Sequence, residues 1–308
     1  MNDIRSAILR TLCFHTAWEY APTLSELMCG LDFGPCESSC YEKGSSFLLE
    51  NEIQSMCTEK IISELAGRYG LPDYLTQIVA TVHDRDILQP RKRRLARMIT
   101  KLLSRMSGVR FVALANTAAL GKARDKSDID FFIITRAGRM WTTRLCIAGP
   151  LRFLGMLPRA DERPDAICLS YFITDAGLDL STHMLSHDDP YYRHWFMSLV
   201  PLFDDGIGTE LWKSNAGFIM RHPFAMKWML PPDLEVHIPR FRLRFGNVFE
   251  SLAQKFQKKW FPKSITDIQN TNTNVLVRDD VLKFHVGDRR EKFKSMYIAY
   301  CKQYDIQP

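Results

Sequence analysis

The sequence predicts an α+β fold, and three observations lead to this class. Three short apolar runs have the length and alternation of β-strands, at Val109–Leu114, Ile129–Thr135 and residues 166–173. The stretches around them repeat apolar residues every three or four positions, which is typical of amphipathic helices. The 308 residues are 46% hydrophobic and 25% charged, the composition of a globular protein with room for two or three domains.

The first region, residues 1–88, is predicted to be helical. Residues 4–18 are amphipathic, Thr23 can cap a helix over 24–31, and residues 57–69 form another helix. Residues 42–45 fit a hairpin turn, which would make the region winged-helix-like. It is either a DNA-binding domain or a small helical scaffold, and the short, turn-rich stretch 32–41 favours the scaffold.

The second region, residues 89–175, opens with Pro90 and a basic helix that runs from Arg91 to Arg105. Its predicted buried face consists of Leu95, Met98, Ile99, Leu102 and Met106. The opposite, cationic face is either a nucleic-acid contact or simply solvated. The three predicted strands follow, with a helix over 141–154 before the last of them.

The third region, residues 176–308, is predicted to be mainly helical. Pro190 introduces one helix, and others are expected over 210–220, 241–260 and 289–304. Residues 277–285 alternate like a short strand or hairpin. His285, Asp288 and Arg289 form either an acceptor-binding cluster or a strand-end turn, and the turn is favoured.

Two carboxylates open the second strand. Asp128 and Asp130 are two residues apart, so a strand places both on one face. Adjacent carboxylates repel each other, and a divalent cation between them relieves that repulsion. The sequence therefore predicts an Mg²⁺ site at Asp128 and Asp130.

A turn of small residues precedes this pair. Thr117 is separated from Asp128 by ten residues, and Gly121 lies between them, so backbone N–H groups here can hold phosphate oxygens. With the Ser-Asp-Ile-Asp string at 127–130, the pattern resembles the DNA polymerase beta-like nucleotidyltransferase superfamily. That family has Gly-Ser or Gly-Gly before the spacer; here Asn116 stands in place of the Gly and Thr117 in place of the Ser.

The resemblance extends along the chain. Residues 7–12, 22–24, 135–145, 167–172 and 200–203 are similar to a bacterial group of predicted nucleotidyltransferases, in which a helical, winged-helix-like segment precedes the transferase core. It implies a short mixed sheet with helices on one face. It also implies an Mg²⁺-dependent transfer of a nucleoside monophosphate from an NTP to a hydroxyl of a small molecule, protein or RNA.

The resemblance implies a third carboxylate from the strand at 166–173. Alternation directs Ile167, Leu169, Tyr171 and Ile173 to the core and Ala166, Cys168, Ser170 and Phe172 to the active-site face. None of the latter is acidic. Asp165, at the strand entrance, is the first candidate for the catalytic partner of Asp128 and Asp130, and Asp175 and Asp179, just beyond the far end of the strand, are the alternatives. The expected nucleotide-binding residues are Asn116, Thr117, Gly121, Lys122, Ser127, Arg139 and Arg144.

Composition constrains partners and location loosely. A formal net charge of +6 is compatible with nucleotides or nucleic acid. No apolar stretch is long enough to span a bilayer and no secretory signal is evident, so a cytoplasmic protein is expected. The spacing of Cys29, Cys36, Cys40 and Cys57 fits zinc poorly, which favours incidental thiols. The alternative to an enzyme is a catalytically degenerate nucleotidyltransferase fold that binds nucleotides or acts as a nucleic-acid-associated regulator.

Overall fold

The computed structural model describes residues 3–34, 46–120, 125–158, 164–186, 188–243 and 247–308. Its centre is a six-stranded sheet in the order β6-β3-β4-β5-β8-β7, with β4 and β5 parallel and the other neighbours antiparallel. The strands are β3 (Val109–Leu114), β4 (Ile129–Thr135), β5 (Ile167–Thr174), β6 (Val200–Asp204), β7 (Val275–Val277) and β8 (Val281–Phe284). The α+β class is confirmed, and the three predicted strands are found.

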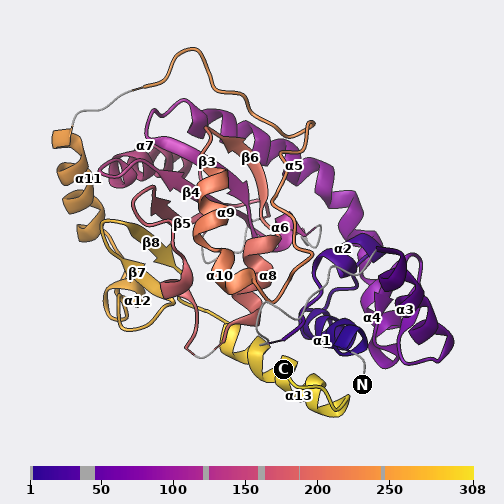
Figure 1. Ribbon diagram of the computed structural model, residues 1–308. Helices are drawn as coiled ribbons and strands as arrows, with labels where there is room; N and C mark the ends of the chain where they lie inside the picture. The colour runs from indigo at the N-terminus through magenta and orange to yellow at the C-terminus, as the bar shows by residue number, and fades with distance from the viewer. Residues whose placement is uncertain (1–2, 35–45, 121–124, 159–163, 187, 244–246) are drawn as a thin grey trace.

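Alternation along the strands gives the sheet two apolar faces, and both are covered by helices (Figure 1). On β4, Ile129, Phe131 and Ile133 face one core, whereas Phe132 and Ile134 face the other. The first core is covered by α5 (Val82–Ser104), α7 (Met140–Phe153) and α11 (Asn247–Lys259), the second by α8 (Pro190–Met197), α9 (Gly208–Ser214) and α10 (Ala216–Ile219). The helices α5 and α7 therefore lie on one face, as predicted, together with α11 of the C-terminal region, and the C-terminal helices α8 to α10 cover the other.

The C-terminal region also completes the sheet. β6 pairs with β3, β8 pairs with β5, and β7 forms the edge. The boundaries predicted at 88 and 175 both fall within continuous structure. Helix α5 extends across residue 88, and strands before and after residue 175 are hydrogen-bonded in one sheet. A site on this sheet can draw residues from distant parts of the sequence.

The buried stripe of α5 differs from the prediction. Its core residues are Ala96, Ile99, Leu103 and Met106, while Met98 and Leu102 are 55% and 40% exposed. The stripe is thus rotated from the predicted one and follows positions 92, 96, 99 and 103. This rotation turns Lys92 inward, where it is 2% exposed.

The N-terminal region folds around its own small core. It contains α1 (Asp3–Ala17), α2 (Leu24–Cys29), α3 (Ser46–Thr58), β1 (Ser63–Leu65), β2 (Arg68–Gly70) and α4 (Pro72–Ala80). Thr23 caps α2 as predicted, because its hydroxyl accepts a hydrogen bond from the Glu26 N–H while the Glu26 carboxylate accepts one from the Thr23 N–H. On α3, Glu50 is exposed and Glu52 pairs with Arg5, which also pairs with Glu59 just after the helix. This acidic arrangement does not favour contact with DNA phosphates.

One predicted helix is wrong. Instead of continuing over 57–69, α3 ends at Thr58 and residues 63–70 form the hairpin β1–β2. Its turn contains Ala66 at φ 53° and Gly67 at φ 73°, the positive values that a two-residue hairpin turn requires. The predicted hairpin turn at 42–45 lies outside the described residues.

The remaining elements complete the C-terminal region. Besides those already given, the structure has the short helices α6 (Asn116–Ala119), η2 (Ser181–His183) and α12 (Lys263–Thr266), and the final helix α13 (Arg290–Gln303). The helix expected over 210–220 is divided at Asn215 into α9 and α10, and α11 begins at Asn247 rather than near 241. α13 packs against α1, which brings the two ends of the chain together (Figure 1). Within the described ranges, no helix combines the length and apolarity needed to cross a membrane.

Candidate functional site

The two carboxylates of the motif lie at the start of β4. Ile129 and Phe131 face the core beneath α5 and α7, so Asp128 and Asp130 are on the other side of the chain. Asp130 lines a cavity of about 450 Å³. The structure thus places this pair beside a space large enough for a ligand.

Burial and mutual repulsion both act on this pair. Partial burial, reinforced by the charge of Asp130, raises the pKa of Asp128 to about 6, although Lys92 opposes the shift. Burial also raises the pKa of Asp130, against hydrogen bonds from the Cys168 and Asn116 side chains. Within the described part of the chain, no cationic side chain lies within 4 Å of either carboxylate. A ligand with positive charge would relieve both burial and repulsion.

The turn before the pair is held against it. Ala115 N–H donates to the Asp130 carbonyl at 3.0 Å, and α6 begins at the next residue. Asn116 has φ 53°, a left-handed conformation that Asn tolerates better than most residues, which accounts for Asn in a position where the resembled family has Gly. Thr117 is half-buried on α6. Gly121 and Lys122 lie outside the described residues, so the second half of the expected phosphate turn has no structural account.

A buried lysine fixes the segment that leads into Asp128. Lys92 Nζ donates to the carbonyl oxygens of Ser127 at 2.7 Å and Asp125 at 3.2 Å, and it pairs with Asp165 Oδ1 at 2.7 Å. Ser127 therefore contributes a backbone anchor. Lys92 belongs to the basic run that was expected on the cationic outer face of this helix, yet its spacing of four residues from Ala96 was the signal that it shares the buried stripe.

Asp165 does not join the carboxylate pair. It is held by Lys92 and also pairs with Arg91, both from α5. Within the described residues, no group of three His, Cys, Asp or Glu side chains is arranged to hold a metal ion. The Asp165 carboxylate, just before β5, is thus engaged by two cations of α5 rather than by a metal ligand set among the described residues.

The face of β5 follows the prediction only in part. Cys168 and Ser170 line the cavity with Asp130, as expected. A register shift between β4 and β5 follows this point, since Asp130 pairs with Cys168 but Phe132 pairs with Tyr171. This bulge reverses the later alternation, so Tyr171 lines the cavity while Phe172 packs into the opposite core.

The two predicted arginines belong to α7 and the residue before it. Arg139 follows the far end of β4, roughly 20 Å from its start for a seven-residue strand. Arg144 is on α7, where it donates to Gln257 Oε1 at 2.7 Å and lies 4.9 Å above the Phe284 ring. Burial lowers the pKa of Arg144 to about 10. Arg144 thus packs against Phe284, which lines the cavity. Arg139 is not brought to the site.

The rest of the cavity wall comes from the C-terminal region. Aromatic rings form much of it, and cationic side chains lie at the end formed by β8 and α13. The lining residues from this region include Tyr191, Tyr192, Trp195, Lys283, Phe284, His285, Asp288, Arg289, Arg290 and Phe293. The cluster of His285, Asp288 and Arg289, for which a simple turn was favoured, thus faces the same space as Asp130.

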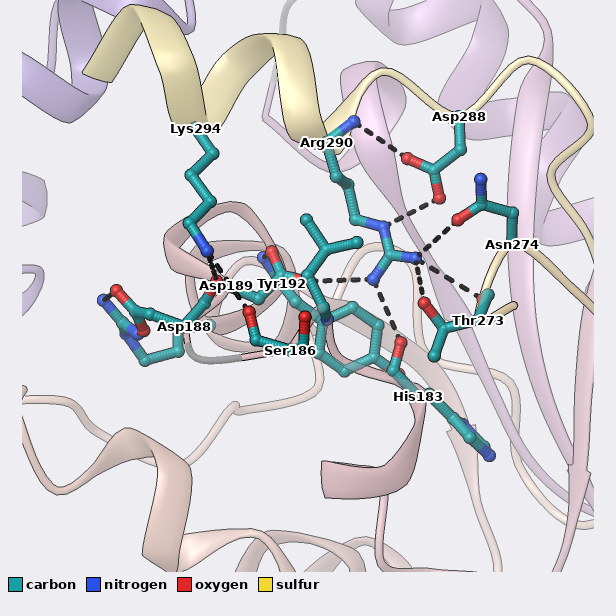
Figure 2. Close-up of polar contacts among 12 residues, drawn as sticks. His183, Ser186, Asp188, Asp189, Tyr192, Thr273, Asn274, Asp288, Arg290 and Lys294 are labelled. Carbon is teal, nitrogen blue, oxygen red and sulfur yellow. Dashed lines mark hydrogen bonds and ion pairs between the residues drawn. The ribbon is translucent and has the colours of Figure 1, made fainter. Parts of the chain in front are cut away.

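Arg290 organises that end of the cavity (Figure 2). Its guanidinium donates to Asp189 at 2.7 Å and to Asp288 at 2.7 Å, and it reaches the hydroxyl of Thr273 at 3.0 Å. Lys294, one turn later on α13, donates to the Asp188 carbonyl at 2.7 Å. The network joins α13, the start of α8 and the turn before β7, so three separate segments form one rigid wall.

Comparisons with protein-family models, with curated proteins and with solved structures found no match for this chain. Function is therefore inferred from the site itself. The site consists of two carboxylates that repel each other, a turn held against them, and a cavity with aromatic and cationic walls.

Proposed function

We propose that the protein is an Mg²⁺-dependent nucleotidyltransferase, which transfers a nucleoside monophosphate from an NTP to a hydroxyl of an acceptor. The observation that carries this proposal is the pair Asp128 and Asp130. Asp130 lines a cavity of about 450 Å³, and among the described residues no cationic side chain forms an ion pair with either carboxylate. A cavity of this size, with aromatic walls, suits a nucleotide.

The donor set fits magnesium. Asp128 and Asp130 supply hard carboxylate oxygens, the ligands that Mg²⁺ prefers, and their raised pKa values show that negative charge is held there at a penalty. These two residues would hold the ion. When bound, the ion would supply charge neutralisation for the nucleotide phosphates during transfer.

The chain's own residues would position the substrate. Asn116 and Thr117 lie beside the carboxylates, where the resemblance implies phosphate contacts. Tyr191, stacked on Phe293 with ring centroids 5.3 Å apart, offers a flat wall on which a base can pack. The acceptor would enter from the end formed by β8 and α13. Its identity as a small molecule, a protein or RNA is part of the proposal to be tested.

One observation favours a second candidate, a catalytically degenerate nucleotide-binding protein. Cys168 and Ser170 occupy the positions on β5 that face Asp130, where the resemblance implies a third carboxylate, and Asp165 is engaged elsewhere. Such a protein would bind the nucleotide without turnover. In a nucleic-acid-associated form it would use the exposed cations Arg94, Lys101 and Arg105 of α5.

The test is calorimetric titration with non-hydrolysable ATP, GTP, UTP and CTP analogues, each with and without Mg²⁺. We expect Mg²⁺-dependent binding of at least one analogue, and its loss in Asp128→Asn. Asp125→Asn is the matched control, because the Asp125 side chain is 60% exposed and three residues away. Absence of binding for every analogue would overturn both candidates, whereas binding without turnover on a panel of hydroxyl acceptors would select the second.

A further inference from the structure

Lys283 is the unusual charge of the cavity. It lies on β8 opposite Tyr171 of β5, it lines the cavity, and it is 1% exposed. Its Nζ donates to the Thr273 carbonyl at 2.8 Å and lies over the rings of Tyr171 and Tyr192, at 5.6 and 5.4 Å from their centroids. An ammonium group has three N–H donors, so this environment satisfies it only in part.

The nearby carboxylates are committed to another cation. Asp189 and Asp288 each bind Arg290 at 2.7 Å. Among the described residues, no carboxylate lies within 4 Å of Lys283 Nζ. A buried ammonium without an ion partner is unfavourable unless a bound group completes it.

We propose that Lys283 is the binding residue for an oxyanion, a phosphate or carboxylate group, carried by the acceptor substrate. This inference rests on the proposed function, since it assigns the acceptor to the second end of the same cavity. Asp130 is on β4 and Lys283 is two strands away on β8, roughly 10 Å across the sheet. A phosphate bound at Asp130 is too far away to form an ion pair with Lys283. This distance favours the acceptor as the source of the oxyanion.

The proposal predicts that anion binding is linked to proton uptake. Burial, assisted by the charge of Arg290, lowers the pKa of Lys283 to about 7. A bound anion raises that pKa again, so above pH 7 the complex takes up a proton. The titratable and charged groups that face Lys283 are Tyr171, His183, Asp189, Tyr192, His285, Asp288 and Arg290.

The histidine and tyrosine side chains among these neighbours do not add to the proton uptake near neutral pH. Burial lowers the pKa of His285 to about 3 and that of His183 to about 4, so both rings are neutral. Burial raises the pKa of Tyr171 and of Tyr192, so both hydroxyls stay protonated. The two aspartates remain paired with Arg290. Among the described residues that face it, Lys283 is therefore the group whose charge changes between pH 6 and 9.

The test uses sulfate and acetate as probes, because neither titrates between pH 6 and 9. Each is titrated into the full-length protein at pH 6, 8 and 9, in two buffers of different ionisation enthalpy. We expect binding roughly 10 to 100 times tighter at pH 6 than at pH 9, with uptake of up to one proton at pH 8. Lys283→Met and Lys283→Gln should abolish it, and Lys302→Met, at an exposed lysine of α13, should not.

Two further arms identify the source of the oxyanion and separate this proposal from the proposed function. The probe should bind together with the Mg²⁺-nucleotide analogue, and competition between them would overturn the assignment to the acceptor. Binding in Asp128→Asn should persist. If the nucleotide fails to bind while Lys283-dependent anion binding remains, only the proposal of transferase activity is overturned. Anion binding without proton uptake, or unchanged in both Lys283 variants, would overturn the inference about Lys283.

Discussion

Two clusters of aspartates in this molecule differ in how their charge is compensated. Asp32, which is 2% exposed, pairs with Arg193 at 3.2 Å and with Arg221 at 2.8 Å, and both arginines also pair with Asp188. Asp128 and Asp130, by contrast, repel each other, and the charge of Lys92 lowers the pKa of Asp128 without overcoming burial and that repulsion. The first cluster alternates charges of opposite sign, and the second concentrates charges of one sign.

The pKa directions show the consequence of that difference. Burial works against ionisation of Asp32, but His222, Arg193 and Arg221 more than offset it and hold the pKa of Asp32 below its ordinary range. The pKa of Asp128 moves the other way, to about 6. The compensated cluster joins the N-terminal region to α8 and stabilises the fold, while the uncompensated one lies at a cavity, where a ligand can complete it.

The largest expected effect comes from breaking the compensated cluster. Arg193→Met leaves Asp32 buried with one arginine fewer, and we expect a loss of ~3–5 kcal/mol in the free energy of unfolding, measured with urea. Because the pKa of folded Asp32 is lowered, its contribution is present above about pH 4 and is lost as the pH falls further. This acid-sensitive loss should shrink in the variant. A loss below ~1 kcal/mol would show that the cluster is not a stabilising element.

Removing the buried charge of Lys283 should increase the free energy of unfolding. Lys283→Met replaces a buried charge by an apolar chain, and we expect a gain of ~1–4 kcal/mol in unfolding free energy at pH 6. The pKa of folded Lys283 is about 7 against an ordinary 10.5, so the unfolded chain binds more protons between these values. Wild-type stability should therefore rise with pH across that window, and the gain should vanish by its upper end. A destabilised variant would mean that Lys283 is structurally compensated.

The carboxylate pair should show a smaller gain of the same sign. The pKa of Asp128 in the folded state is about 6, above its ordinary 3.8, so its contribution to stability falls as the pH rises through this interval. Asp128→Asn removes this loss, and we expect a gain of ~1 kcal/mol at pH 7 after allowing for solvent screening. Thermal unfolding at pH 4 and pH 7 measures it. Equal effects at the two pH values would contradict the proposed repulsion.

The smallest effect is expected at an exposed ion pair. Arg278 and Asp280 are 3.1 Å apart, with side chains 42% and 44% exposed. Arg278→Gln should change the unfolding free energy by less than ~0.5 kcal/mol, because water screens both charges. The same urea titration used for Arg193→Met checks this value. A change comparable to that of Arg193→Met would show that burial does not determine how strongly an ion pair stabilises this fold.

Local pattern was sufficient for much of the core. The strands at Val109–Leu114 and Ile129–Thr135 were predicted with their observed bounds, since alternation along a strand is encoded within the strand itself. The cap at Thr23 was predicted for a similar reason, because both partners lie within one helical turn. The prediction of a helix over 57–69 was wrong. Ala66 adopts a positive φ there, and alanine is not a residue type that indicates this conformation.

Sequence alone determined the α+β class and the presence of two carboxylates on one face of a strand, because both follow from periodicities of two and 3.6 residues. Tertiary structure alone decided what surrounds them. Lys92 anchors Ser127, just before Asp128, from 35 residues away, and Lys283 and Arg290 reach the same cavity through β8 and α13. Such contacts depend on which strands pair and where a bulge falls, and these choices are settled by packing of the whole chain rather than by any local pattern.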